Sequence, residues 1–140
     1  VDPAVGDIED TDSVMVVMKT ASGKLCHINN SRRTTYGYDQ RLEVHGAKGR
    51  LMVGNRVGTL VEIADDNSVR SDKPLHFFLD RYAEAYRAEL AAFAETVVAG
   101  QPMPINPTDG RQALVLAEAA HKSLSTGRSV KVLPVSVLSA

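Results

Sequence analysis

Hydrophobic residues follow a strand-like pattern in the first half of the chain. Short runs rich in valine, leucine, isoleucine and methionine are separated by turns that contain glycine, which is typical of β-strands. The expected strands cover residues 13–20, 25–31, 38–46, 50–53 and 59–63. The first two are predicted to form a hairpin and the last three a meander.

The apolar period changes to steps of three and four in the second half. This change predicts an amphipathic helix over residues 76–99. A second helix is expected from residue 108 or 109 to Gly127, because a polar residue can cap its start and glycine can end it. After it, Val130, Val132 and Leu133 predict a short strand that pairs back into the sheet.

Strands followed by helices predict an α+β fold, built on an open, mainly antiparallel sheet with the helices packed on one face. The other face needs a different cover, because the strands carry apolar residues on both sides. In the first strand, for example, Val16 lies between Met15 and Val17. We therefore expect the domain to self-associate through the sheet face, as a homodimer or a homotetramer.

Composition and charge exclude several classes of protein. The 140 residues have room for about one domain. The 16 basic and 17 acidic residues leave a net charge of -1, which creates no field that would concentrate nucleic acid. The longest apolar runs, such as residues 14–18, are far shorter than the about 20 residues that a membrane span needs. We expect no nucleic-acid partner and no membrane partner.

The start of the chain has the character of a connecting segment. Residues 1–12 include five acidic residues and no basic one, which is typical of a solvated linker. The chain begins with Val1 rather than methionine, so we expect a fragment of a longer protein. Cys26 is the single cysteine, and no leader segment opens the chain, so the expected location is cytoplasmic.

Sequence motifs for nucleotides, hydrolytic nucleophiles and metals are absent. The chain has no G-x-G-x-x-G, no G-x-x-x-x-G-K-[ST] and no G-x-S-x-G. Its four histidines lie too far apart in the sequence for the usual zinc spacings. We expect this chain by itself to hold neither a dinucleotide nor a metal ion.

The segment 28–41 carries the most informative chemistry. It places amides, hydroxyls, two adjacent arginines and two tyrosines between two expected strands, where a plain turn would need only glycine, asparagine or aspartate. Such groups donate and accept hydrogen bonds in fixed directions, which suits a ligand rich in hydroxyl groups. The alternative interpretation is a solvated loop in which Tyr36 and Tyr38 are packing residues.

Several motifs carry a family resemblance. The segments 29–33 (NNSRR), 36–41 (YGYDQR) and 43–49 (EVHGAKG) resemble the C-terminal half of bacterial myo-inositol 2-dehydrogenases, a branch of the glucose-fructose oxidoreductase (Gfo/Idh/MocA) family. The resemblance continues through residues 77–82 and 85–90 and through Asp109-Gly110-Arg111 at a helix start. It therefore covers nearly the whole chain.

The resemblance implies a two-domain, NAD-dependent enzyme that oxidises a ring hydroxyl of inositol, or of a related polyol or sugar, to a ketone by hydride transfer. The family's N-terminal domain binds the dinucleotide and carries the catalytic lysine, and its catalytic Asp and His lie upstream of the region that resembles this chain. Residues 1–140 then form the C-terminal substrate-binding and oligomerisation domain, without catalytic or cofactor-binding residues. The substrate-binding residues that the resemblance implies are Tyr38, Asn30, Arg33 and Tyr36.

A function of a different class stays open from the sequence. The chain could form a free-standing association module that dimerises through its sheet face and has no catalytic role. The two hypotheses differ in what precedes the chain, because only the enzyme needs an upstream dinucleotide-binding segment.

Overall fold

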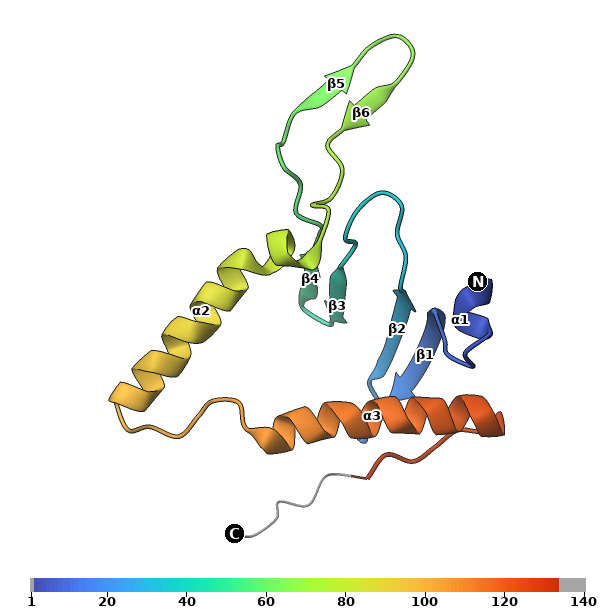
Figure 1. Ribbon diagram of the computed structural model, residues 1–140, viewed down its shortest axis with the longest axis vertical. Coiled ribbons are helices and arrows are strands. Elements are labelled where there is room, and N and C mark those ends of the chain that lie inside the picture. Colours follow the sequence, from blue (N-terminus) through green and yellow to red (C-terminus); the bar gives the residue numbers. More distant parts are fainter. Residues whose placement is uncertain (1, 134–140) are drawn as a thin grey trace. The chain divides into compact units, whose positions relative to one another are not determined.

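The computed structural model describes residues 2–133, which form three helices and six strands (Figure 1). The chain divides into two compact units, residues 1–90 and 91–140. The first unit contains the six strands, a short N-terminal helix and the first part of helix α2 (Phe78–Val98). The second contains the rest of α2 and helix α3 (Pro107–Thr126).

A short helix, α1 (Pro3–Gly6), lies within the segment that was expected to be a linker. Asp2 caps it, because its carboxylate accepts a hydrogen bond from the first helical turn and a proline follows. The acidic residues here also pair with the arginines that follow the second strand. Arg32 lies 3.2 Å from Asp10, and Arg33 lies 2.6 Å from Asp2. These ion pairs connect the N-terminal segment to residues beyond the second strand.

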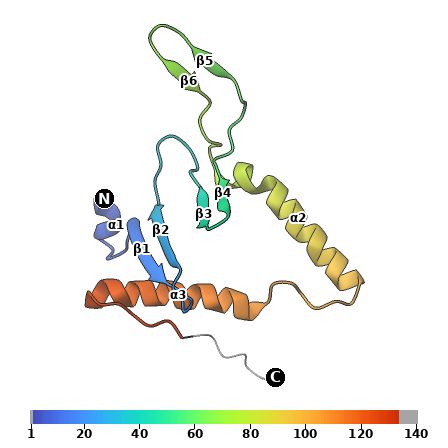
Figure 2. The ribbon, with the colours of Figure 1, turned by 180° about the vertical axis from the view of Figure 1, so that it is seen from behind.

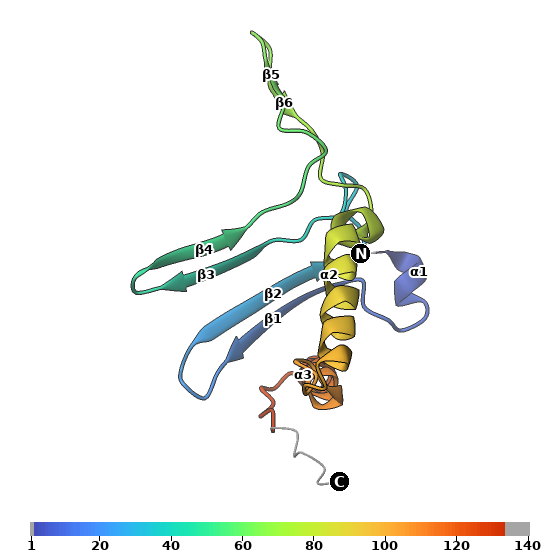
Figure 3. The ribbon, with the colours of Figure 1, turned by 90° about the vertical axis from the view of Figure 1, so that its left-hand side faces the viewer.

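Strands β1 (Ser13–Lys19) and β2 (Leu25–Ser31) form the predicted antiparallel hairpin (Figure 3). Its turn contains Gly23 at φ 85°, a conformation that glycine adopts without steric cost. Burial alternates along β1, because successive side chains point to opposite faces. Met15 and Val17 share one face and are each 79% exposed. An apolar sheet face is therefore uncovered within this unit.

The meander expected over residues 38–63 is wrong in its last strand. Strand β3 (Leu42–Gly46) pairs with β4 (Gly49–Val53) as predicted. Strand β5 (Glu62–Ala64), however, pairs with β6 (Val69–Ser71) and not with β4. Figure 2 shows β5 and β6 as a hairpin of their own. The pattern of apolar residues did not predict β6.

Local hydrogen bonds explain why β5 takes β6 as its partner. The carboxylate of Asp65 accepts hydrogen bonds from the backbone N–H groups of Asn67 and Ser68, which stabilises the tight turn between the two strands. Before this hairpin, Thr59 donates to Asp72 from its backbone and from its hydroxyl, at 2.8 and 2.7 Å. These contacts pair residues 59–64 with residues 69–72 and direct β5 away from β4.

The α+β class with open, antiparallel sheets is confirmed. The described strands form three separate two-stranded ladders, one for each hairpin. Long irregular connections follow the first two hairpins, at residues 32–41 and 54–61. Because these connections hydrogen-bond elsewhere, as described below, they do not continue one ladder into the next.

Both predicted helices are confirmed, with ends within about two residues of those expected. Helix α3 begins at a capping box. The Asn106 side chain accepts a hydrogen bond from the backbone N–H of Asp109, and the Asp109 side chain accepts one from the backbone N–H of Asn106. It ends at Gly127, whose φ of 63° is left-handed. No helix of the described residues is long and apolar enough to cross a membrane.

The strand expected at residues 130–133 is wrong, because this part of the described chain is irregular. The hydroxyl of Ser123 donates a hydrogen bond to the carbonyl of Arg128 at 2.7 Å. That bond uses a carbonyl just before the expected strand and ties it to the last turns of α3. The described residues 130–133 belong to no ladder.

Candidate functional site

The loop between β2 and β3 is anchored by Gly37, the one buried residue in the described part of the chain. Gly37 has φ 133°, and a Cβ built on it would lie 2.6 Å from the carbonyl oxygen of Pro74. The next residue, Tyr38, donates its backbone N–H to the carbonyl of Leu75 at 2.9 Å. The strand predicted to start at residue 38 starts instead at Leu42, because the loop binds this neighbouring segment.

Residues 55–57 form a third segment that supports the loop. Val57 and Pro74 form an isolated antiparallel bridge, and the backbone N–H of Leu75 donates to the carbonyl of Arg56 at 2.9 Å. Arg56 also pairs with Glu84 of α2 at 3.0 Å. Residues 36–41, 55–57 and 74–75 and the first turns of α2 are therefore held together within the first unit.

Tyr38 and Tyr82 lie side by side in this arrangement. Their ring centroids are 5.7 Å apart at an interplanar angle of 80°, an edge-to-face contact. Tyr86 continues the row along α2, 6.3 Å from Tyr82. Burial raises the pKa of the Tyr82 phenol, and the neighbouring Tyr38 hydroxyl raises it further. The Tyr82 hydroxyl is therefore neutral at physiological pH and can both donate and accept hydrogen bonds.

Asp39 connects the side chains around the loop. Its carboxylate accepts hydrogen bonds from the Tyr36 hydroxyl at 2.5 Å, from Arg41 Nε and Nη2 at 2.8 and 2.9 Å, and from Asn55 Nδ2 at 2.8 Å. The Asn55 Oδ1 atom in turn accepts from the backbone N–H of Gln40 at 2.8 Å. The Asp39 side chain is only 10% exposed.

These hydrogen bonds shift two ionisation equilibria. The pKa of Asp39 is lowered to about 2, first by the Tyr36 hydroxyl and then by Arg41 and Asn55, because all three stabilise the charged form. The same bond raises the pKa of the Tyr36 phenol, since the carboxylate would repel a phenolate. Asp39 is thus a charged anchor and not a base suited to neutral pH.

The structure brings two of the four expected substrate-binding residues together. Tyr36 and Tyr38 flank Gly37 in the anchored loop, and Tyr36 is 45% exposed. Arg33 instead pairs with Asp2 and is 79% exposed, and Asn30 lies in β2 opposite Val14. A direct role of these four residues in binding stays a prediction.

Sequence reasoning assigned Tyr82 to the apolar face of a helix and did not count it as a site residue. A signal was present, because Tyr82 ends the segment 77–82, which belongs to the family resemblance. The contact between Tyr82 and Tyr38 joins residues 44 positions apart, so helical periodicity alone could not reveal it.

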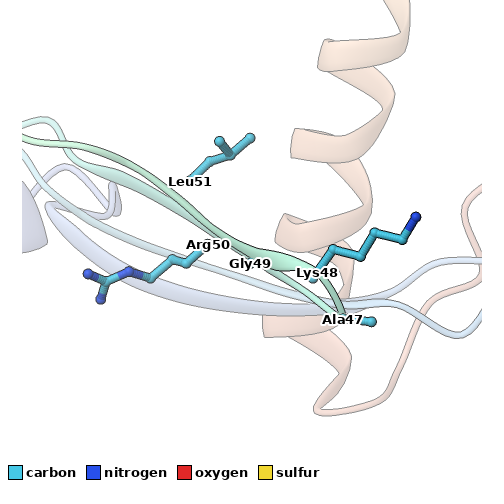
Figure 4. Close-up of a pocket in the computed structure, with 6 residues that line it drawn as sticks. Ala47, Lys48, Gly49, Arg50 and Leu51 are labelled. Carbon is cyan, nitrogen blue, oxygen red and sulfur yellow. The ribbon is translucent and has the colours of Figure 1, made fainter.

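A separate hollow lies beside the turn between β3 and β4, lined by Gly46–Leu51 (Figure 4). Lys48 and Arg50 contribute its charges. Because six consecutive residues of one hairpin form it, it is a surface concavity. Several separate segments converge, in contrast, at the loop of residues 36–41, which we call the tyrosine loop. Within residues 2–133, no group of three His, Cys, Asp or Glu side chains could hold a metal ion.

Comparison with known proteins places this geometry in a family. Residues 2–132 match the Gfo/Idh/MocA family, described as "Oxidoreductase family, C-terminal alpha/beta domain". The chain is 45% identical over 132 residues to a myo-inositol 2-dehydrogenase of Thermotoga maritima, and 44% identical over 133 residues to an inositol 2-dehydrogenase of Rhizobium meliloti. Each match covers 94% of this chain.

The fold is shared with a solved structure as well. The crystal structure of a myo-inositol dehydrogenase from Corynebacterium glutamicum matches with a TM-score of 0.91 at 41% identity, over 96% of this chain and 41% of that one. The chain spans 40% of the length of the two curated relatives. It therefore belongs to the Gfo/Idh/MocA oxidoreductase family and corresponds to its C-terminal α/β domain.

Proposed function

We propose that this chain is the substrate-binding domain of an NAD-dependent inositol dehydrogenase, which oxidises a ring hydroxyl of inositol or a related polyol to a ketone. The observation that carries the proposal is the anchored loop of residues 36–41 in a member of an oxidoreductase family, where Tyr38 contacts Tyr82 of α2 and Asp39 holds the Tyr36 hydroxyl. The similarity to inositol dehydrogenases over 94% of the chain supports inositol as the substrate class.

The chemistry of the loop suits a polyol ring. Phenolic hydroxyls both donate and accept hydrogen bonds. Each can therefore be the donor or the acceptor toward a ring hydroxyl, unless its hydrogen is already donated to a neighbouring residue. The faces of Tyr38 and Tyr82 add apolar surface for the C–H groups of the ring. The anchoring of Gly37 against Pro74 holds these groups in place before a ligand arrives, which lowers the entropic cost of binding.

The cofactor belongs to a different part of the enzyme in this proposal. NAD would accept a hydride from the ring carbon. This chain has no glycine-rich phosphate-binding turn, and the pKa of Asp39, about 2, makes it unsuitable as the base. The chain's own contribution is to bind and orient the polyol, while an N-terminal domain supplies NAD binding and the proton acceptor. A cytoplasmic location accords with this activity.

Exposed apolar residues on two of the hairpins support a second role, self-association. Met15 and Val17 of β1 and Leu51 of β4 are each more than 70% exposed. A second copy of the domain could cover such surface, as a homodimer or homotetramer. If the domain has no catalytic role, the same exposed apolar surface favours the alternative function, a non-catalytic association module.

One assay on the full-length protein separates the enzyme from the module. Purified full-length protein is mixed with NAD and either myo-inositol or scyllo-inositol, and NADH formation is followed by its absorbance. We expect NADH formation that saturates with inositol, and the matched control omits the polyol. A full-length protein that associates but forms no NADH with inositols or related sugars would contradict the enzyme proposal and favour the module.

A further inference from the structure

The carboxylate of Asp39 is saturated with hydrogen bonds. Its Oδ1 atom accepts from Arg41 Nε and Asn55 Nδ2, and its Oδ2 atom accepts from Arg41 Nη2 and the Tyr36 hydroxyl. A carboxylate has about four acceptor sites, so these four donors use its capacity. Asp39 therefore has no acceptor site left for a ligand, and any effect on a ligand must pass through a neighbour.

The neighbour that can transmit an effect is Tyr36. Its hydroxyl has one hydrogen and two lone pairs. Because the hydrogen is donated to Asp39 at 2.5 Å, only lone pairs are left for a ligand. The side chain is 45% exposed, so a ligand can approach it. Held in this way, Tyr36 accepts hydrogen bonds from a ligand and does not donate them.

We propose that Asp39 is a positioning residue that fixes Tyr36 as a hydrogen-bond acceptor, so that the site selects a polyol with a free, donating hydroxyl at the ring position facing Tyr36. The inference rests on the proposed function, because it assigns the selection among polyols to the same loop that is proposed to bind the substrate. A methyl ether or a ketone at that ring position only accepts hydrogen bonds and would find no donor on Tyr36.

Electrostatics keep this arrangement constant over the neutral pH range. The pKa of Asp39 is lowered to about 2, so its carboxylate stays charged. The hydrogen bond to Asp39 raises the pKa of the Tyr36 phenol, so that its hydrogen stays in place. Arg41 lies on the same carboxylate, and Asp39 raises the pKa of its guanidinium. The direction of the Tyr36 hydroxyl is thus decided by a permanent charge.

The test replaces the charge in the full-length enzyme. In Asp39→Asn the amide has one oxygen. Arg41 Nε and Asn55 Nδ2 both donate at the Oδ1 position, so the oxygen takes that position. The amide N–H₂ then takes the Oδ2 position, where it loses the bond from Arg41 Nη2 and faces Tyr36. The hydroxyl hydrogen of Tyr36 then points outward. We expect KM for inositol to rise roughly tenfold while kcat changes by less than about twofold, the effect of one mismatched hydrogen bond.

A spectroscopic readout separates positioning from a merely structural role. Titration of the tyrosine absorbance, with Tyr36→Phe subtracted to isolate the Tyr36 signal, should show a lower Tyr36 pKa in Asp39→Asn than in the wild type. The matched control is Asp65→Asn, which also removes a carboxylate bound to an arginine, Arg70, but in the turn between β5 and β6. This control should change neither KM nor the Tyr36 titration.

Two further comparisons keep the inference falsifiable if Asp39→Asn folds poorly. Wild type should bind inositol far more tightly than its O-methyl ethers at one ring position, and Tyr36→Phe should lose most of that preference. In a Tyr36→Phe background, Asp39→Asn should leave KM unchanged. An equal rise in KM in both backgrounds, or an unchanged Tyr36 titration, would overturn the inference.

Failure of the proposed function would look different. A wild-type full-length protein that oxidises no inositol would overturn the proposed function and the polyol as ligand together. The tyrosine titration does not depend on activity, so it would still report whether Asp39 controls the Tyr36 hydroxyl.

Discussion

The backbone of Gly37 passes so close to Pro74 that a Cβ on Gly37 would lie 2.6 Å from the Pro74 carbonyl oxygen. Real Cβ atoms do not approach a backbone oxygen so closely, and the φ of 133° disfavours side chains in any case. This contact locks the tyrosine loop onto the segment that leads into α2. Neither strand pattern nor turn composition reveals it.

Gly37→Ala should therefore destabilise the full-length protein by about 3 kcal/mol or more, from backbone strain and a clash that cannot relax. Denaturant unfolding measures the loss. Gly23→Ala is the control, because Gly23 also has a left-handed φ, 85°, but a Cβ there meets nothing within 4 Å. It should cost about 1 kcal/mol, from strain alone. Equal losses in the two variants would contradict the close contact.

Tyr38→Phe should impair inositol turnover by the full-length enzyme while it leaves folding intact, because it removes one hydroxyl beside Tyr82 and keeps the edge-to-face ring contact. A lost polar contact costs about 0.5 to 1.5 kcal/mol, so kcat/KM should fall roughly twofold to tenfold. Tyr86→Phe is the matched control, since Tyr86 also contacts Tyr82 but belongs to α2 and not to the loop. An unchanged kcat/KM for Tyr38→Phe would mean that Tyr38 is a packing residue.

The isolated chain should neither bind NAD measurably nor oxidise inositol, because it contains no glycine-rich phosphate-binding turn. Isothermal titration calorimetry with NAD tests the first part, and the full-length protein provides the positive control. Micromolar binding to the isolated chain would show a nucleotide site that the sequence motifs do not describe.

Self-association should depend on the exposed face of β1. Val17→Lys places a charge on that face, which is apolar and 79% exposed at Val17, and should shift the full-length protein toward a monomer in sedimentation. If the interface has standard size, it buries about 800 Å² per partner. Ala21→Lys, in the turn after β1, is the control and should leave the oligomer unchanged. A wild-type protein that stays monomeric at high micromolar concentration would contradict association through the sheet.

Acid should weaken the fold in part through Asp39. Its pKa is lowered in the folded state, from 3.8 to about 2, so the folded protein binds fewer protons than the unfolded chain between these values. The stability that Asp39 contributes is complete above pH about 4 and is lost as the pH falls toward about 2. Asp39→Asn should flatten this part of the pH-stability curve.

Some acid dependence should persist in that variant, because the pKa values of Asp65 and Glu84 are also lowered, by backbone hydrogen bonds and by Arg56 respectively. Unfolding free energies measured from pH 2 to 5 give the comparison. An identical curve for wild type and Asp39→Asn would contradict the charged network around the loop.

Local order was predictable from the sequence. The first two hairpins and both long helices follow from apolar periodicity, and the end of α3 follows from Gly127. The residue that caps the start of α3 is Asn106, and not residue 108 or 109 as expected. These features depend on neighbours within a few positions, so a single segment contains enough information to specify them. The family motif around Tyr36 and Tyr38 likewise pointed to the loop that the structure shows to be anchored.

Contacts between distant segments were decided only by the tertiary structure. The pairing of β5 with β6, the approach of Gly37 to Pro74, the contact of Tyr38 with Tyr82 and the bond from Asn55 to Asp39 join parts of the chain that no local period relates. Each depends on how irregular connections satisfy their backbone and side-chain hydrogen bonds. The sequence supplied the polar and aromatic residues of segment 28–41, and the packing of these connections decided which of them meet and which distant residues, such as Tyr82 and Asn55, join them.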